Sequence, residues 1–325
     1  MKHIIKRGCF LTLMFMLLGC LSLYAADNDL ITKQITINLE KAGTLPDRIA
    51  SSKKYKITNL KIIGEINGTD LRMIREMAGR NSSGDYTDGK LSVLDLSEAK
   101  IVEGGGCYSN YLYTSNDVIG NLAFEGCSGL TSLNLPAGIT SIGYRAFKGC
   151  SGLTSLTLPD GITVIGYSAF YGCSGLTSLT LPDGITKIGD YAFEGCSGLT
   201  SLNLPAGITS IGSYAFVNCS GLTSIYVYAE KVPYIGSIVF VGVDAKKCTL
   251  YVPMGTRDDY RLSDFGNYFE NIVEFEATGI DKTTTSTEVE EVARYSVNGQ
   301  RLSAPTKGLN IVKYSDGSVK KVAVQ

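Results

Sequence analysis

Residues 127–136 read CSGLTSLNLP, and this stretch recurs almost letter for letter along the middle of the chain. A fixed repeat of this kind indicates a supersecondary unit that stacks on copies of itself, because one unit cannot bury its own apolar side. The copies begin at cysteines spaced 23 residues apart, namely Cys127, Cys150, Cys173, Cys196 and, for a more divergent copy, Cys219.

Alternating side chains within each copy predict a short strand. Leu133 and Leu135 point to one face of that strand, whereas Ser132 and Asn134 point to the other. Pro136 ends the strand because proline has no N–H for the next ladder bond. The leucines therefore face the interior of a stack, and the polar side chains face solvent.

The rest of each unit returns the chain to the start of the next. Ile139 and Ile142 bring apolar side chains back beneath the strand, and a helical or irregular turn at Ala146-Phe147 places a ring between layers. A period of 23 residues lies within the range of leucine-rich repeats. We therefore expect an α/β leucine-rich-repeat solenoid with about seven parallel strands, about 4.8 Å apart, on its concave face.

The stack extends past the clean copies and needs caps at both ends. An earlier strand is expected at 91–96, then an irregular insertion over 102–117, and a terminal strand at 248–253. The whole chain then divides into a signal peptide at 1–26, an N-terminal cap at 27–90, a repeat domain with its C-terminal cap at 91–275, a linker at 276–291 and a small C-terminal β module at 292–325.

Residues 1–26 have the pattern of an export signal. Three Lys or Arg residues precede an apolar stretch over 10–23, which is too short and wrongly flanked for a membrane span. One interpretation is ordinary cleavage near Ala25 or Ala26. The other is lipidation of Cys20 in Leu-Leu-Gly-Cys, although the residues after Cys20 are still apolar. Both interpretations export the chain.

The composition restricts the chemistry available to the chain. With 30 basic and 31 acidic side chains, its net charge of −1 lacks the basic surface that nucleic-acid binding requires. The single histidine, His3, lies in the signal peptide, so the mature chain has no imidazole for triads, general bases or metal ligation. Only carboxylate, lysine, tyrosine or thiol chemistry remains for an enzyme, and the uniform Ser/Thr/Asn ladder supplies no pair of carboxylates facing each other across a cleft. We expect no enzyme activity, no cofactor and no metal site.

The repeated sequence AFxGCSGLTSLxLPxGITxIG resembles the BspA-like leucine-rich repeat, whose motif is highly specific. The resemblance covers residues 91 to about 275. This repeat is typical of secreted and surface proteins of Bacteroides and related anaerobic gut and oral bacteria. It implies secretion or display at the cell surface or outer membrane, with adhesion to host proteins or cell–cell contact. It implies no catalytic residues and no particular ligand.

The 23-residue ladder of cysteines has a structural interpretation. In this repeat class such a column normally packs inside, and free cysteine is among the most buried residue types. Disulfides between rungs are the alternative in an exported chain, whereas a metal column lacks histidine and Cys-x-x-Cys spacing. The expected structural thiol ladder comprises Cys127, Cys150, Cys173, Cys196 and Cys219.

The outward strand positions of most repeats carry only Ser, Thr and Asn, which offer a ligand little area. The fifth repeat differs, because Tyr226 and Tyr228 replace an Asn/Thr and a Pro, and Tyr251 is equivalent to Tyr226 on the next strand. Tyrosine is enriched at interface hot spots, so these three form our candidate ligand-binding patch. The alternative is that the rings only cover the open edge of the stack. A second candidate is the insertion with Tyr108, Tyr111 and Tyr113.

These observations favour an exported surface binding or adhesion protein that recognises a host protein or another cell-surface partner through its repeats. The alternative is a structural or self-associating surface component, since identical stacked units favour lateral packing. The expected partner is a protein or a glycan at the cell surface and not a nucleic acid. Contact with the membrane is expected only through a lipid anchor on Cys20.

Overall fold

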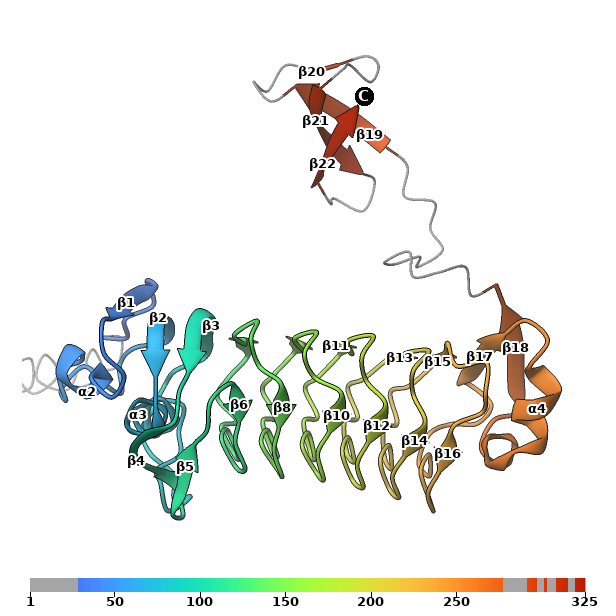
Figure 1. Ribbon diagram of the computed structural model, residues 1–325, viewed down its shortest axis with the longest axis horizontal. Coiled ribbons are helices and arrows are strands. Elements are labelled where there is room, and N and C mark those ends of the chain that lie inside the picture. Colours follow the sequence, from blue (N-terminus) through green and yellow to red (C-terminus); the bar gives the residue numbers. More distant parts are fainter. Residues whose placement is uncertain (1–28, 277–290, 297–300, 303–307, 315–318, 325) are drawn as a thin grey trace, which may run out of the picture. The chain divides into compact units, whose positions relative to one another are not determined.

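The computed structural model describes residues 29–276 and, farther along, the strands at 291–296, 301–302, 308–314 and 319–324 (Figure 1). The chain divides into two compact units, residues 1–276 and 277–325. The expected signal peptide with Cys20 and most of the expected linker lie outside the described residues. Within the described residues, no helix is both long and apolar enough to cross a membrane.

The repeats form stacked coils with a strand on each of two sides (Figure 1). We call the first side the long-strand sheet; its repeat strands are β7 (Ser132–Asn134), β9 (Ser155–Thr157), β11 (Ser178–Thr180), β13 (Ser201–Leu204), β15 (Ser224–Val227) and β17 (Thr249–Pro253). The second side is the short-strand sheet, with β6 (Val118–Ile119), β8 (Ser141–Ile142), β10 (Val164–Ile165), β12 (Lys187–Ile188), β14 (Ser210–Ile211) and β16 (Tyr234–Ile235). Paired strands run parallel and in register, as Ser178 with Ser155, but within residues 29–276 no ladder joins β11 to β13, so the long-strand side consists of two successive sheets.

The predicted solenoid of stacked coils with parallel strands is confirmed. The coils themselves contain turns where we allowed for helices. Within residues 29–276, every helix lies before Val93 or after Pro253. Each coil is therefore held by its strands and by hydrogen bonds between turns, such as the one from the Phe147 N–H to the Ala169 carbonyl (2.8 Å).

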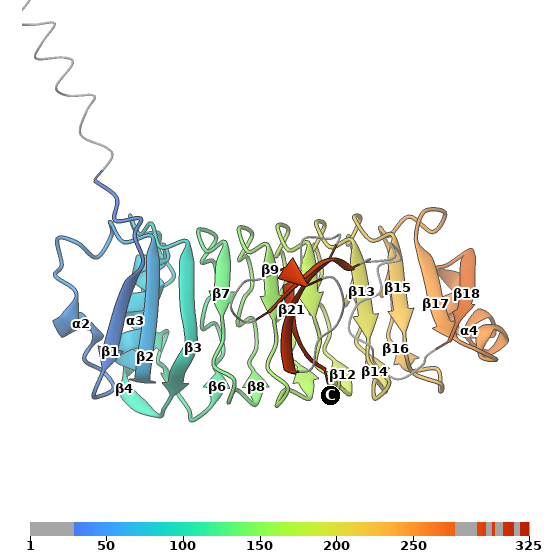
Figure 2. The ribbon, with the colours of Figure 1, turned by 90° about the horizontal axis from the view of Figure 1, so that it is seen from above.

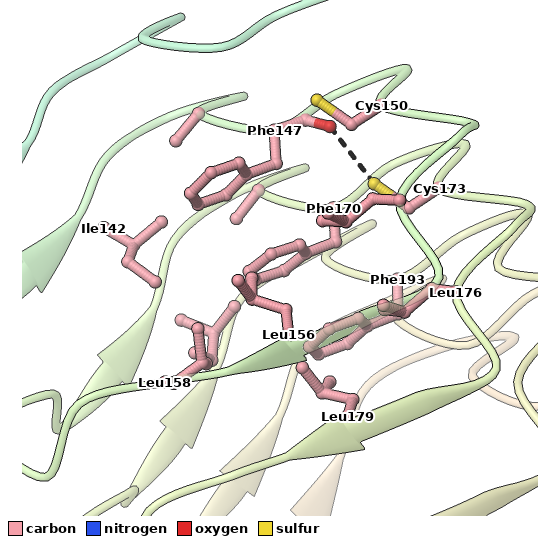
Figure 3. Packing of buried hydrophobic residues seen from close by; sticks show 14 of the residues in the cluster. Ile142, Phe147, Cys150, Leu156, Leu158, Phe170, Cys173, Leu176, Leu179 and Phe193 are labelled. Atoms are coloured by element: carbon pink, nitrogen blue, oxygen red, sulfur yellow. Dashed lines mark hydrogen bonds between the residues drawn. The ribbon is translucent and has the colours of Figure 1, made fainter. Parts of the chain in front are cut away.

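A column of phenylalanine rings fills the centre of the stack (Figure 3). The rings lie nearly parallel, with centroids 5.1 Å apart for Phe147 and Phe170 and again for Phe170 and Phe193. Inward leucines of the long-strand sheet, such as Leu156, and inward isoleucines of the short-strand sheet, such as Ile142, close the core around them. The buried column comprises Phe124, Phe147, Phe170, Phe193, Phe216 and Phe240.

The N-terminal end continues the long-strand sheet. There β1 (Ile35–Leu39), β2 (Asn59–Ile66) and β3 (Val93–Ile101) pair in parallel, and β3 pairs with β7 (Figure 2). The helices α2 (Leu45–Arg48) and α3 (Gly68–Met77) lie between these strands in sequence. A capping box starts α3: the Asn67 side chain accepts from the Thr69 N–H (3.0 Å), and the Asp70 carboxylate accepts from the Asn67 N–H (2.9 Å).

The insertion over 102–117 is not irregular, as we had expected, but contains an antiparallel hairpin of β4 (Gly104–Ser109) and β5 (Leu112–Thr114). Its glycines allow the hairpin backbone to approach the start of α3. A Cβ at Gly105 would lie 2.3 Å from the Asn67 Oδ1 atom. The Gly106 N–H donates to the Thr69 hydroxyl (2.8 Å), which fixes the hairpin against the helix.

Our second candidate site is wrong for Tyr108, because its side chain is buried (1 % exposed) and cannot contact a ligand. Its hydroxyl donates to the Asn121 carbonyl (2.8 Å). In the next coil, the equivalent carbonyl of Tyr144 accepts the Leu122 N–H of the preceding coil (2.9 Å). The first coil has no preceding coil, so Tyr108 supplies the missing donor and acts as part of the cap.

The C-terminal end is closed by α4 (Arg257–Leu262), a 3-10 helix η1 (Asp264–Asn267) and a last parallel strand, β18 (Asn271–Phe275), which pairs with β17. The Tyr260 hydroxyl donates to the Ala229 carbonyl (2.7 Å). Phe265 and Phe269 pack on the last ring of the central column, Phe240. The apolar end of the core is thereby covered.

The second unit is a small antiparallel sheet. Its strands are β19 (Glu291–Ser296), β20 (Arg301–Leu302), β21 (Gly308–Tyr314) and β22 (Val319–Val324), in the order β20-β19-β21-β22.

Candidate functional site

The cysteine ladder lies inside the stack, next to the phenylalanine column. All five members are free thiols and buried. The Cys173 thiol donates to the Phe147 carbonyl in the preceding coil (3.1 Å; Figure 3), and Cys150, Cys196 and Cys219 make the equivalent bond. A thiol fits this position because it is small and apolar yet can donate to a turn carbonyl.

Burial sets the protonation state of these thiols. It raises the pKa of Cys127 to about 11 and that of Cys173 to about 12, because a thiolate there would be removed from water. The column therefore consists of neutral thiols at neutral pH, and thiolates are the reactive and metal-binding form. Within the part of the chain that the structure describes, no group of three or more His, Cys, Asp or Glu residues is placed to hold a metal ion.

The outward surface of the long-strand sheet is uniform and polar over most of its length. Just before each strand, a threonine hydroxyl donates to the preceding coil, as Thr154 does to the Thr131 carbonyl (3.2 Å) and Thr177 to the Thr154 carbonyl (3.1 Å). The outward side chains of the strands themselves, such as Ser155 and Thr157 on β9, are small. They offer a ligand little apolar area.

This polar surface is interrupted by an aromatic cluster, which we define as Tyr226, Tyr228, Tyr251 and Phe275. Tyr226 on β15 pairs in register with Tyr251 on β17, and their rings stack with centroids 4.3 Å apart and an interplanar angle of 7°. Phe275, at the end of β18, packs edge-on against Tyr226 (5.7 Å) and Tyr228 (5.2 Å). The structure thus brings the three predicted tyrosines together and adds a phenylalanine.

The cluster is half-buried, so each ring is held in place and still reaches solvent. Burial, and next the neighbouring Tyr251 hydroxyl, raise the pKa of Tyr226, so this phenol stays neutral and can donate a hydrogen bond. The stacked pair Tyr226 and Tyr251 does not lie on the last strand of the sheet. β18 follows β17, with Val273 in register with Tyr251 and 41 % exposed, and Phe275 joins the cluster from that last strand.

The other candidate tyrosines lie at the opposite end of the stack, on the β4–β5 hairpin (Figure 1). Tyr111 and Tyr113 are 87 % and 57 % exposed, whereas Tyr108 is buried. No aromatic pair within residues 29–276 joins Tyr111 or Tyr113 to another ring. The hairpin therefore presents separate rings and does not form a cluster.

Sequence reasoning missed a second row of rings, which we call the tyrosine column: Tyr144, Tyr167, Tyr191 and Tyr214. These rings follow the short-strand sheet and stack from coil to coil, with centroids 5.5, 5.4 and 4.7 Å apart. The four tyrosines do not follow the 23-residue repeat in the sequence, because the spacing between Tyr167 and Tyr191 is 24 residues. Tyr144 and Tyr167 directly follow a glycine, whereas Tyr191 and Tyr214 come one position later.

The comparisons with known proteins concern the repeats. Residues 117–247 match, in six copies, the model of the family described as "BspA type Leucine rich repeat region". No curated protein matches the chain significantly.

Similar solved structures include a leucine-rich repeat protein of T. pallidum, with 29% identity over 45% of this chain and 72% of that chain (TM-score 0.39). A leucine-rich repeat protein of Bacteroides ovatus has 21% identity over 76% of this chain and 64% of that one (TM-score 0.41). A leucine-rich cell surface protein of Faecalibacterium prausnitzii has 26% identity over 61% of this chain and 44% of that one (TM-score 0.37). This chain spans less than two thirds of the latter two.

Proposed function

The chain carries a BspA-type leucine-rich repeat region, and from this premise we propose that it is an exported adhesion protein that binds a protein partner at the cell surface. The partner is a host protein or a protein on another cell. The repeats act as the scaffold, and the aromatic cluster of Tyr226, Tyr228, Tyr251 and Phe275 supplies the anchoring side chains.

The observation that carries this proposal is the aromatic cluster on a sheet whose other outward side chains on the repeat strands are small and polar. A protein interface draws most of its affinity from a few large side chains, among which tyrosine is enriched. Stacking of Tyr226 on Tyr251, and the edge contacts of Phe275, hold the rings before a partner arrives. Pre-ordered rings lose little conformational entropy on binding, so more of the contact energy appears as affinity.

Export is part of the same proposal. The pattern of residues 1–26 supports passage across a membrane, with Cys20 as the position for a lipid anchor or Ala25 and Ala26 as the cleavage region. The buried, neutral thiols are compatible with an oxidising exterior, because an oxidant reaches them only after the coils open.

The test is capture of a partner by the immobilised chain from separate panels of host extracellular-matrix proteins, mucin and bacterial surface glycans. We expect at least one protein to bind, and the double variant Tyr226→Ala/Tyr251→Ala to lose that binding. Tyr234→Ala is the matched control, since Tyr234 is 71 % exposed on the short-strand sheet, away from the cluster. The melting temperature of each variant separates loss of a binding site from loss of the fold.

Two outcomes would contradict the proposal. Binding that survives the double variant would place the site elsewhere. Absence of any captured protein, together with concentration-dependent sedimentation of the chain, would instead favour a self-associating surface component.

A further inference from the structure

The tyrosine column places four phenols in one row at the protein surface. Tyr144 and Tyr167 are 38 % and 43 % exposed, and Tyr191 and Tyr214 are half-buried behind them along the stack. Tyr191 and Tyr214 are parallel within 1°, with ring centroids 4.7 Å apart. By contrast, Tyr167 and Tyr191 are tilted by 48° and 5.4 Å apart.

The backbone explains why the column is continuous although its sequence spacing changes. Each coil has one residue in the left-handed region at the same place in the turn, with φ of 51° at Ser168, 58° at Tyr191 and 61° at Tyr214. In the coils of Tyr144 and Tyr167 the ring precedes this residue, and in the next two coils the tyrosine itself occupies it. The change of position tilts one pair and leaves the last two rings in equivalent places.

Two pairs of tyrosines in the described part of the chain therefore share one geometry: Tyr191 with Tyr214, and Tyr226 with Tyr251. In each pair the residues lie in successive coils, the rings are parallel within 7°, and the centroids are no more than 4.7 Å apart. This geometry places the face of one ring against the face of the other in each pair.

We propose that these two parallel pairs are sites of oxidative tyrosine cross-linking, at which hydrogen peroxide and a haem peroxidase join successive coils through a dityrosine bond. The proposal concerns covalent modification and does not depend on the binding function proposed above. The solenoid then has two positions at which an external oxidant can link successive coils covalently.

The chemistry is balanced. One molecule of peroxide accepts, through the peroxidase, one electron and one proton from each of two phenols, and it leaves as two molecules of water. The two phenoxyl radicals form one carbon–carbon bond between the carbons beside their oxygens. Each of these carbons then loses its hydrogen to the phenolic oxygen as the ring regains aromaticity. The product is lighter than the starting protein by two hydrogen atoms per bond.

Proximity selects the partner of each radical. A radical at Tyr214 has the parallel ring of Tyr191 at 4.7 Å, and holding two reactants in place converts an encounter between molecules into a step within one molecule. Tyr144 and Tyr167 are the more exposed entry points, and contact between rings allows a radical to exchange along the column. Tyr111 and Tyr234 are also exposed, but within residues 29–276 neither is in a stacked pair, so they cannot form this intramolecular bond.

The described thiols compete little with the phenols. The thiols of the ladder are buried and neutral, because burial raises the pKa of Cys173 to about 12. Cys107 is the half-buried exception among the described cysteines, so the test uses Cys107→Ser as its background.

The experiment treats the dilute chain with peroxide and a haem peroxidase and maps the cross-linked peptides by mass spectrometry. We expect intramolecular links between Tyr191 and Tyr214 and between Tyr226 and Tyr251, with dityrosine fluorescence and a higher melting temperature. Tyr214→Phe keeps the ring stack but removes the first link alone, and Tyr251→Phe removes the second alone. The control Tyr234→Phe leaves both links in place.

The urea-unfolded chain is the decisive comparison, since there proximity is lost. We expect it to give scattered links of low yield. The proposal is overturned if the folded chain forms neither link while free tyrosine couples in the same mixture. It is equally overturned if folded and unfolded chains give the same pattern of links, or if the tilted pair Tyr167–Tyr191 is joined as readily as the parallel pairs.

Discussion

The Arg75 guanidinium, at the C-terminal end of α3, donates to the Ala123 carbonyl (2.9 Å). In the following coils, the equivalent carbonyl accepts an N–H from the coil before it, as that of Ala146 does from Phe124 (2.7 Å). Arg75 thus replaces the N–H donor that a preceding coil would supply to Ala123. Its guanidinium also donates to the Leu122 carbonyl. A buried arginine ends the stack by supplying the donors that the first coil lacks.

Removal of this cap is expected to destabilise the first coil. Arg75→Met keeps much of the apolar stem but leaves the buried Ala123 carbonyl without a donor, which costs about 1–3 kcal/mol. Chemical denaturation gives the free energy of unfolding, and hydrogen exchange locates the loss near Leu122 and Ala123. Arg72→Met, on the same helix but half-buried, is the control. Equal effects of the two substitutions would show that Arg75 does not act as a cap.

The central ring column gives a second prediction. Phe170 lies between Phe147 and Phe193, with both centroids at 5.1 Å, and it is fully buried. Phe170→Ala therefore leaves a cavity and should lower the free energy of unfolding by about 3–5 kcal/mol. Because repeats are stabilised by their neighbours, protection from hydrogen exchange should fall in the adjoining coils as well.

Tyr171→Ala is the matched control for Phe170→Ala, since its side chain is exposed next to the same position. It should change stability by less than about 0.5 kcal/mol. A loss below about 1 kcal/mol for Phe170→Ala would mean that the column does not hold the coils together.

The thiol ladder predicts an absence of reactivity in the folded state. Cys150, Cys173 and Cys196 are buried, and their thiols donate to carbonyls of the preceding coils. We expect a water-soluble thiol reagent to leave these three unmodified in native buffer and to label all three after denaturation. Rapid native labelling, or a disulfide found between them by mass spectrometry, would argue against the buried ladder.

The same thiols predict a loss of stability at alkaline pH. Burial raises the pKa of Cys173 to about 12, above the ordinary value of 9.0, so the unfolded chain releases this proton at lower pH than the folded chain does. The stabilisation is complete below pH 9 and is lost as pH rises toward about 12, at up to about 1.4 kcal/mol per pH unit for each such thiol. The free energy of unfolding, obtained from denaturation curves at several pH values in this window, should therefore fall less steeply with pH for Cys173→Ala than for the natural chain. Ser174→Ala, an exposed neighbour, should keep the original slope.

The sequence predicts the repeated part of the molecule better than its ends. Tyr226 and Tyr251 could be paired in advance, because aligning the repeats puts equivalent positions of successive strands side by side. Phe275 could not, since the last strand lies outside the 23-residue period and no copy sets its register. Only the alternation of Asn-Ile-Val-Glu-Phe at 271–275 points to a strand there.

Two other errors have physical causes. Tyr108 was assigned to an exposed insertion because that segment is rich in glycine and polar residues, but the first coil needs a donor for the Asn121 carbonyl. The tyrosine column was missed because the left-handed residue of each turn lets rings at two different sequence positions, as in Tyr167 and Tyr191, reach one row. Neither the need for a cap nor the conformation of a turn is visible in hydrophobic periodicity.

The final prediction concerns Phe275 as a positioning residue of the aromatic cluster. Its ring meets the edges of the rings of Tyr226 and Tyr228 at 87° and 88°, and aromatic contacts of this kind contribute about 0.5–1.5 kcal/mol each. Without Phe275 the tyrosines can move, so a partner must order them and the affinity falls. We expect Phe275→Ala to weaken binding of the captured protein about tenfold.

Binding and melting must be measured together, because Phe275 also packs at the end of β18. The melting temperature of Phe275→Ala should fall by no more than about 4 °C, whereas Phe275→Tyr, which keeps the ring, should retain most of the affinity. Met254→Ala is the control, since Met254 is 61 % exposed just after β17 and is not part of the cluster. If Tyr226→Ala abolishes binding but Phe275→Ala leaves it unchanged, then the stacking of Tyr226 on Tyr251 is enough to position the anchor. Phe275 would then have only a structural role at the end of the sheet.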